Sequence, residues 1–303
     1  MIRLFSAIGM SQYTSRKAFD AFLTKLLQEE PVDKTKFSGQ RYMVRGQHHV
    51  ELYHDMGPFQ LIVRGQMTGT YIRAFAVMPA IKEKRGYRLI DCELAESEED
   101  MIYLMGQEQS SLEPICLCLS EVYRFYQSPM LRRRRTLDVS CYGLSVEGKV
   151  LLGIERSEED EQLIREDEQW RRQHLERMMK GDAQAAEEIR ESEARAEEEI
   201  EERLQQEDVY SIFDTFLYPA DGADHFYTML GDIEHVEKLM NSETEEWVYY
   251  LELNVMGQTL RIAINPRDLV GEPRPGRRFM GRAFFQGRLD PAALILENQS
   301  MFY

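Results

Sequence analysis

The chain has 303 residues, of which 43% are hydrophobic and 30% are charged, and its formal net charge is −16. This composition is typical of globular proteins and argues against an intrinsically disordered chain. No uncharged apolar run approaches the roughly 18 residues of a transmembrane helix, and the N-terminus has no signal-peptide pattern. We therefore expect a cytoplasmic protein that has no membrane segment.

Most of the negative charge lies in one segment, residues 155–208. This segment contains 21 acidic and 9 basic residues, a net charge of −12, which leaves −4 for the rest of the chain. Phosphate binding draws on clustered positive charge, so this distribution argues against a general surface for nucleic acid or anionic lipid. A local basic patch is compatible with it.

The N-terminal region is predicted to combine one helix with several strands. Apolar residues recur at three- and four-residue steps from about Ser11 to Glu30, which predicts an amphipathic helix that has Ser11 or Ser15 as its N-cap and ends at Pro31. Val146-Glu147-Gly148-Lys149 has the composition of a hairpin turn. The β-rich runs lie at 49–53, 59–63, 71–77, 87–94, 115–126, 137–144 and 149–154. We expect residues 1–154 to form an α+β domain, in which a mostly antiparallel sheet is backed by the first helix.

Two long helices are predicted in the acidic segment, 155–208. Ser157 followed by three acidic residues is typical of a helix start, and Gly181 is typical of a helix end. Asp182 then caps a second helix that continues to about Gln206. We interpret the charged residues as a solvated helix face, with an acidic recognition surface as the alternative.

The C-terminal region, 209–290, is again predicted to be rich in strands. The strand candidates are 210–218, 226–239, 247–256, 259–264 and 279–289, with a short helical turn at 265–269. One long strand, a hairpin, a short helix and a returning strand indicate a small OB-like β-barrel. Residues 291–303 are interpreted as a tail.

Three segments carry a resemblance to a known family. They are the opening Leu4–Ser11, the helix junction Gly181–Ala185, and the closing run Asp268–Gly281, which Phe284–Leu289 continues. On these residues the chain resembles a family of about this length from Gram-positive anaerobes of the Clostridia type, which is classed only as a domain of unknown function. Members usually have Trp-Leu where this chain has Phe284-Phe285. The resemblance covers nearly the whole chain, and it implies a lineage but no activity, cofactor or site.

No catalytic, cofactor-binding or metal-binding residue is assigned from the sequence. Without an export signal, the four cysteines at 92, 116, 118 and 141 are expected to be reduced. On a strand, His48 and His54 would face one way and His49 the other, which divides the ligands of a metal site. No nucleophile elbow and no glycine-rich phosphate loop occurs. An enzyme therefore has no support from a motif.

Positive charge is concentrated in two places. The first is the run Arg132, Arg133, Arg134 and Arg135, which is expected to form an exposed loop whose charge keeps the chain soluble. Alternatively, it binds the acidic helices of the same chain or of a second copy, or a polyanion such as RNA. The second is the group Arg274, Arg277 and Arg278, close to aromatic Phe284 and Phe285, as in oligonucleotide-binding barrels. We take these seven arginines as the candidate interaction surface.

Three functional hypotheses follow from these patterns. The first is a non-catalytic cytoplasmic interaction or scaffold protein that binds an unidentified protein partner or a second copy of itself. The second is a module that binds oligonucleotides or oligosaccharides through the C-terminal OB-like barrel, although the overall charge is unfavourable for nucleic acid. The third is an enzyme of unrecognised type in the N-terminal domain.

Overall fold

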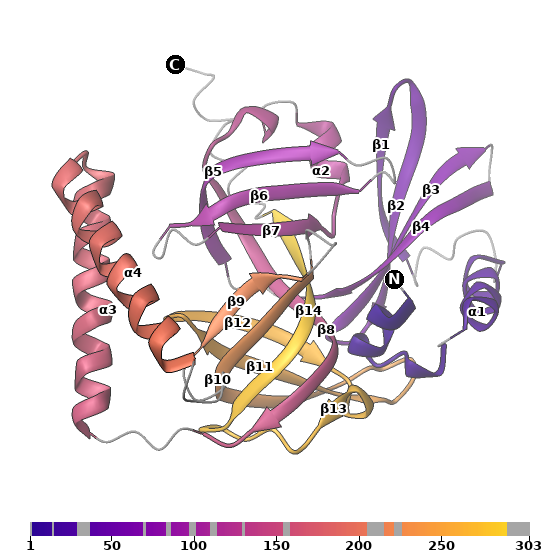
Figure 1. Cartoon of the computed structure of the whole chain (residues 1–303). Helices are drawn as coiled ribbons and strands as arrows, with labels where there is room; N and C mark the ends of the chain where they lie inside the picture. The colour runs from indigo at the N-terminus through magenta and orange to yellow at the C-terminus, as the bar shows by residue number, and fades with distance from the viewer. Residues whose placement is uncertain are drawn as a thin grey trace.

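The computed structural model of the chain (Figure 1) is a mixed α+β structure in which strands predominate. It describes residues 2–13, 15–28, 37–68, 71–82, 86–96, 101–109, 114–128, 131–153, 158–204, 215–220 and 226–289. The strands form two sheets, here called sheet A and sheet B. No described helix is both long enough and apolar enough to cross a membrane.

Sheet A is a four-stranded antiparallel meander near the N-terminus. Its strands are β1 (Phe37–Val44), β2 (Gln47–Met56), β3 (Phe59–Thr68) and β4 (Tyr71–Ile81), in that spatial order. The expectation of a mostly antiparallel N-terminal sheet is confirmed for this part of the chain. Two short 3-10 helices, η1 (Ile2–Ile8) and η2 (Ser11–Tyr13), precede α1 (Arg16–Gln28).

The first α-helix begins after Ser15, the later of the two predicted caps. Ser15 caps it, because its Oγ accepts a hydrogen bond of 3.2 Å from the backbone N–H of Ala18. The hydroxyl of Ser11 is engaged elsewhere, where it donates to the carboxylate of Glu246 at 2.8 Å. Of the two predicted caps, Ser15 is therefore confirmed and Ser11 is wrong.

Sheet B has ten strands and draws them from both sides of the acidic segment. The strands before that segment are β5 (Gly86–Glu96), β6 (Ile102–Glu108), β7 (Pro114–Leu119) and β8 (Leu137–Leu151). The strands after it are β9 (Phe216–Pro219), β10 (Phe226–Met240), β11 (Trp247–Val255), β12 (Gln258–Ile264), β13 (Leu269–Val270) and β14 (Arg278–Leu289). Three short helices, α2 (Tyr123–Gln127), η3 (Leu131–Arg133) and η4 (Pro266–Asp268), connect strands of this sheet.

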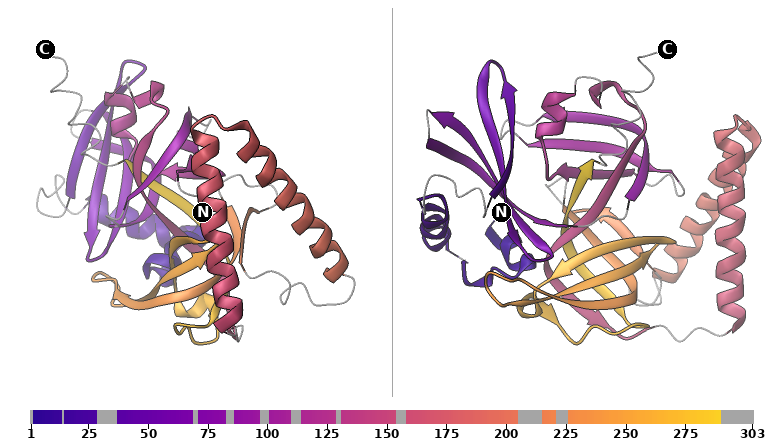
Figure 2. Two further views of the ribbon diagram at one scale, coloured as in Figure 1. Left: turned by 90° about the vertical axis from the view of Figure 1, so that its left-hand side faces the viewer. Right: turned by 180° about the vertical axis from the view of Figure 1, so that it is seen from behind.

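Strand pairing closes sheet B into two rings that share β8 and β14. In the first ring, β5, β6 and β7 form a meander, β5 pairs with β8, and β7 pairs in parallel with β14. In the second ring, β10, β11 and β12 form a meander, β10 pairs with β14, and β12 pairs in parallel with β8. The antiparallel pair of β8 and β14 is the common wall of both rings (Figure 2). Strands β8 and β14 therefore belong to both rings.

The strand prediction needs two corrections in this region. Residues 137–151 form one continuous strand without the predicted hairpin turn, because β14 pairs along its whole length. The turn-like residues hold a bulge instead, where Ser145 pairs with Ala283 and Glu147 pairs with Arg282. The predicted strand 115–126 also ends early, since β7 stops at Leu119 and α2 follows.

The predicted division into domains at residues 154 and 155 stays a prediction. The strands on its two sides share sheet B, and Val139 lies opposite Leu289 at the far end of the common wall. The predicted strand 210–218 overlaps β9 only from Phe216, and residues 205–214 and the predicted tail 291–303 lie outside the described residues.

Two apolar cores stabilise this arrangement. The first lies inside the rings and contains residues such as Leu104, Leu253 and Phe285. The second lies between sheet A, the N-terminal segment and the outer side of sheet B, and it includes Phe5 and Phe59. Burial of apolar side chains contributes about 25 cal/mol per Å². The two cores place sheet B between a filled interior and the N-terminal layer.

A buried charge pair connects sheet A with sheet B. Glu51 of β2 lies opposite Arg64 of β3, and Arg64 Nε donates to Glu51 Oε2 at 3.2 Å. Both side chains are at most 1% exposed. Arg64 also donates to the carbonyl oxygens of Leu119 and Ser120, and Glu51 accepts from the backbone N–H of Val122 at 2.9 Å. The pair thus satisfies backbone groups at the point where β7 ends, and it attaches that point to sheet A.

The acidic segment forms a helical hairpin of α3 (Glu158–Met179) and α4 (Ala183–Leu204). Leu175, Ala185 and Ile189 are buried between the two helices. Gly181 has a φ of 88°, and the carboxylate of Asp182 accepts from the backbone N–H of the next turn, so both predicted helix-end roles are confirmed. In Figures 1 and 2 the hairpin stands beside sheet B, on the side away from sheet A.

Candidate functional site

The alternation of side chains along β14 places two arginines on the outer face of sheet B. Phe279, Ala283 and Phe285 point inward and belong to the core inside the rings. Successive residues of a strand point to opposite faces, so Arg278 and Arg282 face outward. The large inward residues fix this register and with it the direction of both guanidinium groups.

Strand β8 adds a third cation beside the two arginines. Lys149 pairs with Met280, the residue midway between Arg278 and Arg282 on β14. Diagonal neighbours across an antiparallel pair lie about 7–8 Å apart, within reach of long side chains. Glu147 lies opposite Arg282 and is the carboxylate that lines the hollow, and Asp232 of β10 lies opposite Arg278.

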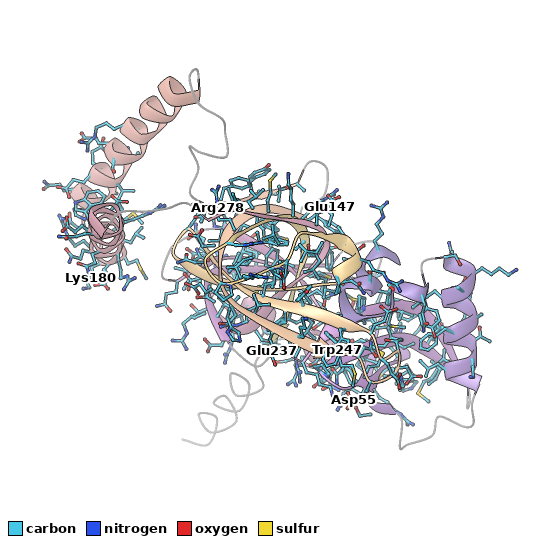
Figure 3. The ribbon with its side chains drawn as sticks, turned by 90° about the horizontal axis from the view of Figure 1, so that it is seen from below. Asp55, Glu147, Lys180, Glu237, Trp247 and Arg278 are labelled. Carbon is cyan, nitrogen blue, oxygen red and sulfur yellow. The ribbon has the colours of Figure 1, made fainter. Side chains whose placement is uncertain are left out.

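These side chains line a hollow that we call the basic pocket. It has a volume of about 650 Å³ on the outer face of β8, β10 and β14. Its lining residues are Glu147, Gly148, Lys149, Leu151, Leu152, Gly153, Thr228, Arg278, Met280, Gly281 and Arg282. Three cations and one carboxylate give the lining a net charge of +2, in a chain whose net charge is −16. Figure 3 labels Arg278 and Glu147 along this border of the strand layer.

Arg278 is held firmly at the edge of the pocket. Arg278 is only 7% exposed, and its Nε donates to the carbonyl oxygen of Leu152 at 3.2 Å. Leu152 itself is 77% exposed and gives the pocket an apolar rim. The arginine therefore contributes a positioned charge next to an apolar surface.

Arg282 has a buried donor that no described residue satisfies. Its guanidinium carbon lies 4.9 Å from the centroid of the Phe226 ring, a cation–π contact. Its Nε is buried and makes no hydrogen bond within the described part of the chain. An unsatisfied buried donor costs about 1–3 kcal/mol.

The structure separates the seven arginines of the predicted interaction surface. Arg278 lines the basic pocket, while Arg274 pairs with the Glu272 carboxylate at 2.5 Å and Arg277 donates to the Glu272 carbonyl oxygen. The run from Arg132 to Arg135 lies at the opposite end of β8, beyond the pairing of Val139 with Leu289.

Within that run, Arg133 and Arg135 are exposed, and Arg135 pairs with Glu93 at 3.2 Å. The side chain of Arg132 lies outside the described residues. The two basic clusters therefore do not form one continuous surface.

Arg282 and Lys149 are site residues that the sequence analysis did not select. The signal for Arg282 was its even spacing from Arg278 on one predicted strand, which puts both on the same face. Lys149 gave no such signal, because its place depends on the register between two strands far apart in the chain.

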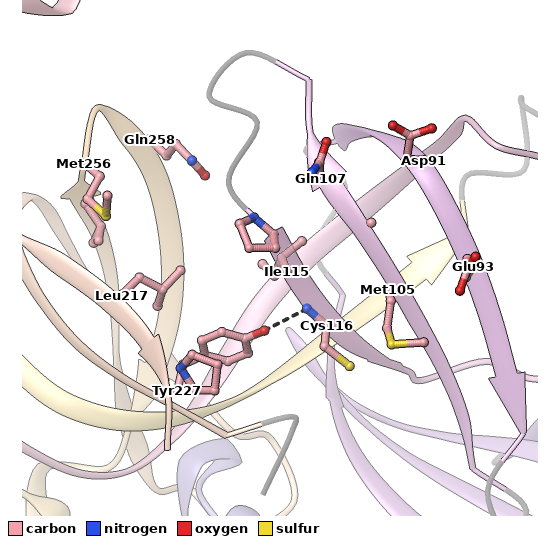
Figure 4. Close-up of a pocket in the computed structure, with 14 residues that line it drawn as sticks. Asp91, Glu93, Met105, Gln107, Ile115, Cys116, Leu217, Tyr227, Met256 and Gln258 are labelled. Carbon is pink, nitrogen blue, oxygen red and sulfur yellow. Dashed lines mark hydrogen bonds between the residues drawn. The ribbon is translucent and has the colours of Figure 1, made fainter. Parts of the chain in front are cut away.

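A second hollow, of about 420 Å³, lies between the two rings (Figure 4). Asp91 and Glu93 line one wall, and the Tyr227 hydroxyl accepts a hydrogen bond of 2.8 Å from the backbone N–H of Cys116. Its described lining contains no histidine, lysine or arginine. No base–nucleophile pair of the kind used in covalent catalysis is formed by these groups.

Three of the four cysteines are buried. The four cysteines form no disulfide, and burial raises the pKa of Cys92 to about 11 and that of Cys118 to about 12, so both are thiols at neutral pH. His54 is buried with its Nε2 3.5 Å from the Glu243 carboxylate. Among the described residues, no group of three or more His, Cys, Asp and Glu is arranged for a metal ion.

The fold and the site define a strand-rich α+β protein that carries a basic pocket. A model of the family described as "Domain of unknown function, E. rectale Gene description (DUF3881)" matches residues 5–287. The chain belongs to this family, and the resemblance inferred from its sequence is confirmed. No curated protein and no solved structure matches the chain significantly.

Two of the segments that carry the resemblance lie in contact. The Ser6 hydroxyl donates to the Asp268 carboxylate at 2.5 Å, and Asn265 Nδ2 donates to the Ser6 carbonyl oxygen at 3.2 Å. Arg267, next to this segment, donates to the Ser11 hydroxyl at 2.8 Å. These contacts attach the N-terminal segment to the second ring, which is a structural role.

Proposed function

We propose that the protein is a non-catalytic cytoplasmic interaction protein whose basic pocket binds a carboxylate group of a partner protein. The cluster of Lys149, Arg278 and Arg282 carries this proposal, because a carboxylate is the kind of group that a lining with a net charge of +2 attracts. Lys149 and Arg278 add positive charge, and the apolar rim suits the stem of a glutamate side chain. Four cysteines without a disulfide support a reducing compartment.

The test uses a fluorescently labelled hexaglutamate peptide and the full-length protein. Binding followed by anisotropy is expected to weaken at least tenfold in Arg282→Met, which keeps the apolar stem over Phe226 and removes the donor. Arg274→Gln is the matched control, because it removes one charge from an exposed arginine outside the pocket. Equal binding by both variants, or no binding by the unmodified protein, would contradict the proposal.

We also infer that the second ring is the OB-like barrel predicted from the sequence. The strand order supports this inference, since a three-stranded meander is followed by η4 and the ring closes with a parallel pairing. The ring takes β8 from the N-terminal region, so residues 209–290 alone supply only part of it.

An oligosaccharide- or oligonucleotide-binding module is the second candidate function. Its support is Trp247, which is 53% exposed and lines a hollow of about 340 Å³ with Lys238, Tyr249 and Pro266. Exposed aromatic rings stack on sugars and bases. Titration of tryptophan fluorescence with a neutral oligosaccharide and with oligo(dT) tests this candidate, with Trp247→Ala as the variant that loses the signal.

A further inference from the structure

We propose that the occupant of the basic pocket is the acidic hairpin of a second copy of this chain. This inference rests on the proposed function and names its partner. It follows from three properties of the hairpin: its charge, its packing and the face that it presents.

The hairpin carries the acidity that the pocket needs. Helix α4 contains nine glutamates and three arginines, a net charge of −6, within the segment that holds most of the negative charge of the chain. Three cations and one carboxylate line the pocket. Opposite charges at close range favour association and fix which surfaces meet.

The two helices of the hairpin pack chiefly on each other. The apolar side chains between them are buried, and the ion pairs of Arg177 with Asp182 and Glu188 connect the two helices at the tip. The hairpin stands beside sheet B in Figures 1 and 2. It therefore has an internal core of its own.

The outer face of α4 presents carboxylates at helical spacing. Ala185 and Ile189 face α3, and Glu187 and Glu191 follow them by two residues, which places both on the opposite side of the helix. Both glutamates are exposed, and Glu187 also pairs with Arg190 of the same helix at 3.1 Å. One such face can bring two carboxylates to the cluster of Lys149, Arg278 and Arg282.

The salt concentration affects the attraction between hairpin and pocket and the repulsion between two copies differently. Two copies each carry −16 and repel at long range, but the Debye length is only about 10 Å at 0.1 M salt and about 3 Å at 1 M. At about 0.1 M the contact between hairpin and pocket is expected to outweigh the screened repulsion, and at about 0.5 M it is expected to weaken.

The experiment is light scattering behind size exclusion on the full-length protein, whose monomer mass is 35.6 kDa. A dimer at about 0.1 M salt that dissociates at about 0.5 M is expected. Arg282→Glu alone and the double variant Glu187→Lys with Glu191→Lys are each expected to be monomeric. An equimolar mixture of the two is expected to form a heterodimer. The acidic hairpin of Arg282→Glu meets the unchanged basic pocket of the double variant, and the lysines of the double variant meet the glutamate introduced at position 282.

The outcomes distinguish this inference from the proposed function. A monomer in both salts, with hexaglutamate still bound in an Arg282-dependent way, overturns the second copy as partner and leaves the proposed function intact. Loss of peptide binding as well overturns both. A dimer that persists in Arg282→Glu or fails to re-form in the mixture also overturns this inference, because another surface then holds the copies together.

Discussion

Glu51 and Arg64 form a charge pair at a point where water is excluded. Each charge has several partners: Tyr53 donates to Glu51, and Arg64 donates to two backbone carbonyl oxygens. Removing one member of such a pair is far more costly than removing both, because a lone buried charge has no compensation. The stability of the contact between the sheets therefore depends on both members being present.

Glu51→Leu is expected to lower the free energy of unfolding by about 3–5 kcal/mol, because it leaves the Arg64 guanidinium buried without its carboxylate. The double variant Glu51→Leu with Arg64→Met is expected to recover most of this loss. Urea unfolding followed by circular dichroism measures both values. A double variant that is less stable than Glu51→Leu alone would contradict this account.

At the scale of the element, the β8–β14 wall depends on glycines at close contact. Gly148 and Gly281 lie opposite each other, and the Phe279 ring fills the space beneath them. A Cβ at Gly281 would lie 2.6 Å from the Glu147 carbonyl oxygen and 2.4 Å from the Phe279 ring. Backbone cannot move aside easily at this position, since both neighbouring strands are paired.

Gly281→Ala is accordingly expected to destabilise the protein by about 1–3 kcal/mol through overpacking. The control is Gly86→Ala on β5, where the nearest atom to the new Cβ is the Val139 carbonyl oxygen at 3.7 Å. It is expected to change stability by less than about 0.5 kcal/mol. Thermal unfolding of both variants provides the comparison, and equal losses would show that contact distance is not the cause.

The residue pattern of each segment predicted most of the helices and strands, but not which strands pair with each other. Apolar alternation located β2, β3, β4, β10, β11, β12 and β14, and composition located both helices of the hairpin. It missed β1, β6 and β13, and it placed a turn within β8 because Glu147-Gly148 resembles a hairpin in isolation. Pairing with β14 overrides that local preference, and register between distant strands is not encoded in spacing.

The same limit applies to the basic pocket. Arg278 was selected from its local context, but Lys149 joins it only through the register of β8 against β14, across more than one hundred residues of sequence. Conversely, Arg274 and Arg277 looked equivalent to Arg278 in the sequence, yet both are directed to Glu272. Closeness in the sequence thus identified a cluster of arginines, but it did not identify which basic residues line the same pocket.

For the whole molecule, the sharing of β8 and β14 determines how the chain can be divided. Fragment 1–153 lacks β14, and fragment 158–303 lacks β8. Because each of these strands belongs to both rings, neither fragment can close a ring. Neither fragment alone is expected to show a cooperative urea transition, whereas an equimolar mixture is expected to recover one. Two independent cooperative transitions would instead support a domain boundary at residues 154 and 155.

The pairing of β8 with β14 can form only after β14 has been synthesised, so it is delayed during translation. Leu289 pairs with Val139, which leaves the ribosome 150 residues earlier. At about 5–20 residues per second, β8 waits roughly 7–30 s for its partner with an open edge. Unpaired strand edges are templates for aggregation. Nascent chains of this protein therefore have a long period in which a ribosome-associated chaperone would reduce misassembly.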